Sequence, residues 1–103
     1  MKKALSLLLF LNCIFFATAS SYTIENIAFP DDMPPEVGGL AFDKNGYLYA
    51  CLRRGDVVVS KPGKDPKSTK WKVFATGLHN PMGIVLLGPG HVLVSQMAEL
   101  TEI

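Results

Sequence analysis

The chain has 103 residues, of which 49% are hydrophobic and 18% are charged, with ten Lys and Arg against nine Asp and Glu. This composition is typical of a globular protein and excludes an acidic tail, a basic nucleic-acid arm and a disordered polyampholyte. Without the first 19 residues, 84 remain, with eight basic and nine acidic side chains and a net charge of −1. That balance lacks the positive excess that nucleic acid or an anionic membrane surface would attract.

The N-terminus has the three parts of an export signal. Lys2 and Lys3 give a positive start, residues 4–16 are mostly apolar, and residues 17–19 form the small-x-small cleavage site Ala-Thr-Ala. An apolar stretch of this length makes a helix of about 20 Å, which is short of a hydrocarbon core of about 30 Å, so a membrane anchor is disfavoured. A lipoprotein anchor at Cys13 is disfavoured because a bulky polar residue precedes it. We predict a signal peptide at 1–19 and a periplasmic or extracellular protein.

A thirteen-residue segment recurs in the rest of the chain. The sequence GLAFDKNGYLYAC at 39–51 matches GIVLLGPGHVLVS at 83–95 without a gap, at an offset of 44 residues. Each copy is typical of two strands around a tight turn, with Asp-Lys-Asn-Gly at 43–46 and Leu-Gly-Pro-Gly at 87–90. The first turn also has the Asp-x-Asn-Gly pattern of a calcium loop. Its two oxygen ligands are too few without a following Glu, so we predict a hairpin turn.

Two further strands are predicted between the copies. Residues 56–60 are a β-branched run and residues 71–75 alternate apolar with polar, whereas 61–70 are rich in Pro, Gly and charge and indicate a solvent loop. Cys51 is expected to be a small buried apolar residue. A unit of four antiparallel strands every 40 to 50 residues is typical of a β-propeller blade. The four strands are expected at about 39–42, 47–52, 56–60 and 71–75.

We therefore predict an all-β fold of about one and a half four-stranded blades of a β-propeller after the signal peptide. The N-terminal strand and linker occupy 20–38, with the strand at about 22–29; the first blade is 39–82 and the start of the second is 83–103. Rings have about four to eight blades, so the chain is expected to be the N-terminal fragment of a longer propeller, the alternative being a self-assembling partial propeller. The core between blades is expected to include Phe42, Tyr49, Trp71 and Phe74.

The repeat resembles the opening of bacterial exported propellers related to the pyrroloquinoline-quinone-dependent glucose and sorbosone dehydrogenases. The resemblance covers about 22–103 and rests on residues 38–43, 53–56, 74–83 and 96–101. It implies a ring of six blades, a pyrroloquinoline quinone held with calcium over the central channel, and oxidation of a sugar or similar polyol. In such relatives a basic residue usually follows Glu-Leu-Thr, whereas Glu102 stands there in this chain. No catalytic, quinone-binding or calcium-binding residue of the family can be placed on this sequence.

Four polar residues are candidates for a site at the loop face. His79 precedes the first strand of the second copy, and histidine is the side chain that most often acts as a general base. Glu36 lies one residue past the equivalent point of the first copy. Arg53 and Arg54 end the second strand, where two guanidinium groups could clamp a carboxylate or a quinone acid. The plainer alternatives are a backbone-capping turn at His79 and a solvated turn at the two arginines, while His91 is expected to have a packing or surface role.

These observations leave three functions open. The leading one is an exported piece of a sugar-dehydrogenase-like propeller, whose complete parent oxidises a sugar alcohol or aldehyde with a bound quinone and whose 103-residue chain alone is inactive. The rival is a non-catalytic propeller module that binds protein or glycan through its loop face. The third is a lactone or ester hydrolase propeller, which requires metal-binding carboxylates that this sequence lacks.

Overall fold

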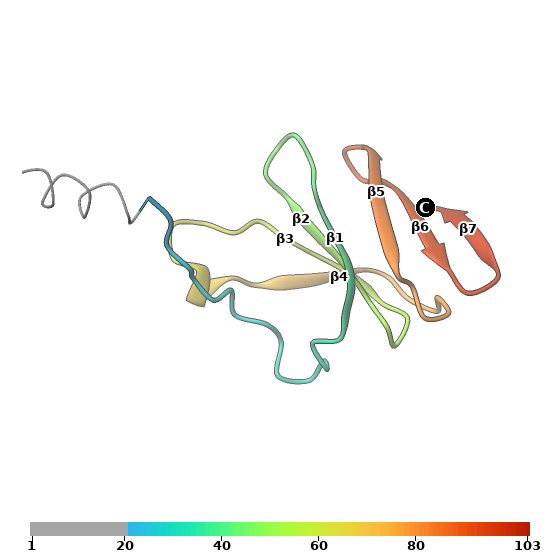
Figure 1. Cartoon of the computed structure of the whole chain (residues 1–103), viewed down its shortest axis with the longest axis horizontal. Helices are drawn as coiled ribbons and strands as arrows, with labels where there is room; N and C mark the ends of the chain where they lie inside the picture. Colours follow the sequence, from blue (N-terminus) through green and yellow to red (C-terminus); the bar gives the residue numbers. More distant parts are fainter. Residues whose placement is uncertain (1–20) are drawn as a thin grey trace, which may run out of the picture.

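The computed structural model describes residues 21–103, so the predicted signal peptide lies outside the described residues. The described chain forms two antiparallel sheets, of four and three strands, and a one-turn 3-10 helix (Figure 1). The prediction of an all-β fold is confirmed. Within residues 21–103, no helix is long and apolar enough to cross a membrane.

The first sheet contains the four strands predicted from the repeat. They pair antiparallel in chain order, each with the next. Each strand begins and ends within two residues of its predicted limits, because β-branched and aromatic residues alternate between turn residues in this region. The strands are β1 (Val37–Phe42), β2 (Leu48–Leu52), β3 (Val57–Ser60) and β4 (Trp71–Ala75). The predicted loop at 61–70 connects β3 to β4 and contains the 3-10 helix η1 (Pro66–Ser68).

The turn between β1 and β2 is the predicted hairpin turn. The carboxylate oxygen Oδ1 of Asp43 accepts hydrogen bonds from the backbone N–H groups of Asn45, at 2.8 Å, and Tyr47, at 2.9 Å. Gly46 has a φ of 85°, in the left-handed region that glycine adopts without a steric cost. The Asp43 side chain therefore holds the backbone of this turn.

The second sheet repeats the first at the level of strand register. It contains β5 (Gly83–Gly88), β6 (His91–Gln96) and β7 (Glu99–Glu102). Gly39 pairs with Cys51 in the first sheet, and Gly83 pairs with Ser95 in the second, so the 44-residue offset holds across both hairpins. The next connection is one residue shorter in the second sheet, and the offset falls to 43 residues in β7.

The N-terminal strand predicted at about 22–29 is wrong, because this segment forms no β-ladder. A strand needs a backbone partner, and in the described chain residues 22–27 are exposed, while Ala28 bonds to Pro66 in the 61–70 loop and Phe29 packs on Trp71. The indole N–H of Trp71 donates to the carbonyl oxygen of Ala28 at 2.7 Å, and the rings of Phe29 and Trp71 have centroids 5.3 Å apart. Phe29 at the end of the segment, together with Met33, thus covers part of the first sheet on the side of Ala50, Leu52 and Val58.

The two sheets pack against each other, with a hydrophobic core between them (Figure 1). Tyr49 and Phe74 meet edge to face in this core, with centroids 5.4 Å apart. A Cβ built on Gly39 would lie 3.2 Å from the Cα of Gly83, so β1 and β5 approach closely at these two glycines. The fully buried members of this core are Cys51, Val57, Val92 and Val94.

Two aromatic residues expected between the sheets lie elsewhere, and their prediction is corrected. Phe42 is 63% exposed on the face of the first sheet that points away from the second. Trp71 lies on that same face, against the N-terminal segment. Side chains alternate across a strand, so Phe42 and Trp71 cannot share a face with Tyr49 in this register.

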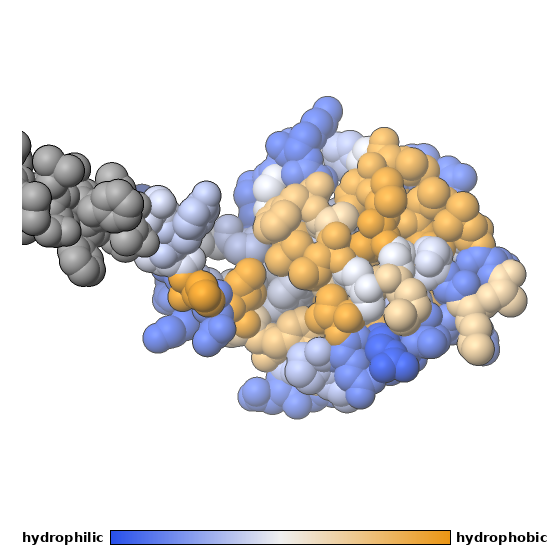
Figure 2. Space-filling model, in the orientation of Figure 1, coloured by the Kyte–Doolittle hydropathy of each residue, from blue (hydrophilic) through white to orange (hydrophobic). Residues whose placement is uncertain are grey.

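Each sheet buries one face on the other sheet and leaves apolar residues bare on its outer face. Leu40 of β1 is 59% exposed, whereas its repeat equivalent Ile84 packs into the core between the sheets. On the other face of the repeat the exposure is reversed: Val85 of β5 is 56% exposed, whereas its equivalent Ala41 is half-buried. Figure 2 shows hydrophobic surface gathered over β5 and its neighbours. The β1 edge of the face that is covered in the second copy is therefore exposed in the first, whereas the rest of that face of the first sheet lies under the N-terminal segment.

Candidate functional site

The four candidate residues lie at one end of the two sheets. Glu36 precedes β1, Arg53 and Arg54 form part of the loop between β2 and β3, and His79 lies in the linker from β4 to β5. In antiparallel sheets these three segments and the loop between β6 and β7 occur at the same end. We call this end the rim.

Arg53 connects three segments of the rim. Its backbone N–H donates to the carbonyl oxygen of Glu36 at 2.9 Å, and its Nε donates to Oδ1 of Asn80 at 3.3 Å. The side chains of Glu36 and Arg53 are both exposed. Arg53 therefore presents guanidinium N–H groups to solvent, and its backbone is bonded to that of Glu36.

Arg54 is held within its own loop. Its guanidinium forms an ion pair with Asp56, a residue only 8% exposed, and its Nη1 lies 3.5 Å from the carbonyl oxygen of Asp32. A buried carboxylate needs such a partner to offset its lost hydration. Arg54 thus neutralises Asp56 and ties the loop to the N-terminal segment, which leaves Arg53 as the freer of the two arginines.

The backbone of His79 is fixed from both sides, and its imidazole ring is exposed. Its N–H donates to Oε1 of Gln96 at 2.6 Å, and its carbonyl oxygen accepts from the N–H of Met97 at 2.8 Å. Among residues 21–103, no carboxylate is hydrogen-bonded to the imidazole ring. The ring therefore lacks the oriented carboxylate that typically accompanies a histidine base.

Sequence reasoning assigned no individual site role to two residues that shape the rim, Asn80 and Gln96. Asn80 has a φ of 45°, which asparagine tolerates better than most residues, and this conformation brings its side chain to Arg53. Gln96 donates through Nε2 to Thr101 and Glu99 while it holds His79. Its signal was available: Gln96 is polar where its repeat equivalent, Leu52, is fully buried.

The remaining candidates carry no site chemistry at the rim. Cys51 is fully buried, as predicted, and burial raises the pKa of its thiol above the usual value of 9.0, against a smaller opposing effect of backbone hydrogen bonds. His91 is exposed at the other end of β6 and its Nε2 is within hydrogen-bond distance of Glu102 Oε1, in agreement with its predicted surface role. The described residues contain no group of three or more His, Cys, Asp or Glu that could hold a metal ion.

In comparisons with known proteins, no protein-family model, curated protein or solved structure matches the chain. The class is therefore defined by the fold and the rim alone. It is an all-β protein of repeated antiparallel sheets, with exposed Arg, Glu and His side chains at one end.

Proposed function

We propose that the chain forms the first blade and the start of the second blade of an exported β-propeller of the sugar-dehydrogenase-like kind, and that its rim contributes to a site for a sugar or similar polyol. The single observation that carries the proposal is the convergence of Glu36, Arg53, His79 and Asn80 from three separate segments on one end of the sheets. Binding sites of repeat architectures are commonly built from loops on one face.

The bare sheet faces support the propeller part of this proposal. The face of the second sheet that packs on the first is the repeat equivalent of the face on which the first sheet leaves Leu40 exposed. A further sheet added by the same step would cover Val85 and its neighbours. Each sheet would thus use one face to bind the sheet before it and the other face to bind the sheet after it. A head-to-tail interface of this kind generates a ring when the rotation from sheet to sheet closes, and propellers are rings of this kind.

The rim has the chemistry to bind a polar molecule with several hydroxyl groups. Arg53 offers N–H donors, Glu36 offers carboxylate acceptors, and the exposed His79 ring offers one of each when neutral. The backbone bonds that fix these segments reduce the entropy that a bound ligand would otherwise have to overcome. The rim of this chain would orient the substrate.

The described residues do not fit the calcium and quinone that the resemblance implies. They contain no metal-binding group of three or more residues, and the Asp43 carboxylate is used by its own turn. Arg54, a candidate for a quinone carboxylate, is paired with Asp56. The proposed oxidation therefore depends on residues other than those described.

The test of this function uses the full exported protein. It is incubated with pyrroloquinoline quinone, calcium, a panel of aldoses and polyols, and an artificial electron-accepting dye. We expect substrate-dependent dye reduction, with a higher KM in Arg53→Gln and little change in the matched variant Lys44→Gln, whose side chain lies at the opposite end of the sheets. Absence of dye reduction above the blank would count against the dehydrogenase.

A second candidate is the non-catalytic module that binds protein or glycan. It is favoured by the unoriented His79 ring and by two exposed methionines near the rim, Met82 at 56% and Met97 at 69%. Flexible apolar side chains of this kind suit a protein-binding surface. Saturable glycan or protein binding that Arg53→Gln weakens, without dye reduction, would select this candidate.

A further inference from the structure

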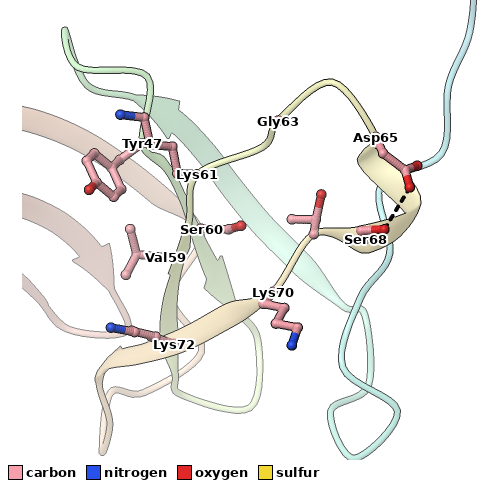
Figure 3. Close-up of a pocket in the computed structure, with 10 residues that line it drawn as sticks. Tyr47, Val59, Ser60, Lys61, Gly63, Asp65, Ser68, Lys70 and Lys72 are labelled. Atoms are coloured by element: carbon pink, nitrogen blue, oxygen red, sulfur yellow. Dashed lines mark hydrogen bonds between the residues drawn. The ribbon is translucent and has the colours of Figure 1, made fainter.

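A pocket lies at the end of the first sheet opposite to the rim. It has a volume of about 460 Å³ and is formed by the end of β3, the start of β4 and the loop between them, with Tyr47 of the β1–β2 hairpin on one side (Figure 3). Pockets of about 300 to 1,000 Å³ accommodate small molecules. None of the residues considered for the rim lines it.

The segment that builds this pocket is strongly positive. Residues 61–72 contain five of the ten basic residues of the chain and a single acidic residue, Asp65. Both carboxylate oxygens of Asp65 are already used, by the N–H of Lys67 and the hydroxyl of Ser68. No ion pair between described residues involves a lysine. The lysines that line the pocket are Lys61, Lys70 and Lys72.

Two buried hydroxyl groups in the pocket have no hydrogen-bond partner among the described residues. They are Ser60 Oγ, in a residue that is only 4% exposed, and Thr69 Oγ1. Figure 3 shows Ser60 directed into the space between β3 and the loop. An unpartnered buried hydroxyl is destabilising, and such groups are rare in native structures. Both residues line the same pocket, where a ligand oxygen can supply the missing partner.

The walls of the pocket define the class of that ligand. Lys61 Nζ lies 5.1 Å from the ring centroid of Tyr47, so the ammonium group stays at the pocket. Three lysines without an ion pair outnumber the one Asp65 carboxylate that also lines the pocket. Ammonium groups and hydroxyl donors together recognise an oxyanion, while Tyr47 and Val59 add an apolar surface. We propose that this pocket binds a small molecule that carries an oxyanion group, that is, a phosphate, sulfate or carboxylate.

The binding test uses the full exported protein at constant ionic strength. Inorganic phosphate, inorganic sulfate and glucuronate are the probes, with glucose as the neutral control, and binding is followed through NMR shifts of the amides of residues 60–72. We expect saturable binding of at least one anion and none of glucose. The anion that binds most tightly distinguishes phosphate, sulfate and carboxylate as the source of the oxyanion.

Variants locate the site without touching the rim. Lys61→Gln and Lys72→Gln should each weaken binding about fivefold, as expected for the loss of one exposed ionic contact. Ser60→Ala should weaken it about tenfold, since it removes a hydrogen bond to a charged group. Lys44→Gln, an exposed lysine outside the pocket, should leave binding unchanged. Unsaturable shifts, no shifts, or an equal loss in Lys44→Gln would overturn the proposal, whatever the outcome at the rim.

Discussion

Gly55 and Leu78 join the β2–β3 loop to the linker between the sheets. The N–H of Leu78 donates to the carbonyl oxygen of Gly55 at 3.0 Å. A Cβ on residue 55 would lie 2.4 Å from the carbonyl oxygen of Leu78, and the φ of Gly55 is 119°. This contact sets the position of Arg53 and Arg54 relative to His79, so the geometry of the rim depends on the absence of a side chain at residue 55.

Gly55→Ala should therefore destabilise the protein by about 2 to 4 kcal/mol, because it combines left-handed strain with a backbone overlap. The matched control is Gly46→Ala, since Gly46 also has a positive φ, of 85°, but a Cβ there would meet no atom within 4 Å. That variant should lose only the strain of about 1 to 2 kcal/mol. Urea unfolding of both variants measures the difference, and equal losses would contradict the close contact.

Asp43→Ala should cost about 1 kcal/mol of unfolding free energy, because two backbone N–H groups of the hairpin turn lose their acceptor. The loss stays small since these groups are exposed and water replaces the carboxylate. Asp43→Asn keeps an oxygen that accepts the same bonds and should lose less than half as much. Equal destabilisation by the two substitutions, measured by urea unfolding, would show that the negative charge matters more than the turn geometry.

The strands were predictable because their signals are local. Apolar alternation and turn residues place β2 and β3 within a residue or two, and the 44-residue repeat predicts the first hairpin of the second sheet. Loops that share one end of a sheet follow from antiparallel order, which explains why the rim candidates lie together.

What the sequence did not predict depends on contacts between distant segments. Residues 22–29 have strand-like composition, yet a strand requires a partner that local sequence does not specify. The exposure of Phe42 depends on which sheet face the neighbour covers, and its apolar character is the same in either case. The link from Gln96 to His79 is a side-chain bond across seventeen residues, and only comparison with Leu52 in the other copy points to it.

The pH dependence of stability should report on Cys51. Burial raises the pKa of its thiol above 9.0 in the folded protein, so below pH 9 both the folded and the unfolded states carry the proton. Above pH 9 the unfolded thiol ionises first, and the free energy of unfolding falls as pH rises through the folded pKa, by at most about 1.4 kcal/mol per pH unit.

The control for this prediction is Cys51→Ala, which removes the thiol and keeps the lysines and tyrosines that titrate in the same pH range. Urea unfolding at several values from pH 8 to pH 10.5 should give a steeper fall for the natural protein than for the variant. Identical slopes would show that the Cys51 thiol has the same pKa in both states.

The bare faces of the two sheets predict how residues 21–103 behave when produced alone. Phe42 is 63% exposed on the outer face of the first sheet, and Val85 is 56% exposed on the outer face of the second. These faces are the repeat equivalents of the two that meet in the core, and the first is open at its β1 edge, beside the part that the N-terminal segment covers. One chain should therefore bind the next head to tail through these exposed edges. Burying each such side chain contributes about 1.5 to 3 kcal/mol. Sedimentation should show self-association that increases with concentration.

Two variants distinguish this head-to-tail contact from non-specific hydrophobic association. Phe42→Lys blocks one face and Val85→Lys blocks the other, so each variant alone should be monomeric, while both should unfold within about 0.5 kcal/mol of the natural monomer because the changed side chains are exposed in it. An equimolar mixture retains one intact pair of faces and should form a 1:1 complex. Tyr22→Lys, at a residue 93% exposed outside both faces, should still self-associate. A mixture that stays monomeric would contradict the equivalence of the faces, since that equivalence requires the intact face of each variant to fit the other.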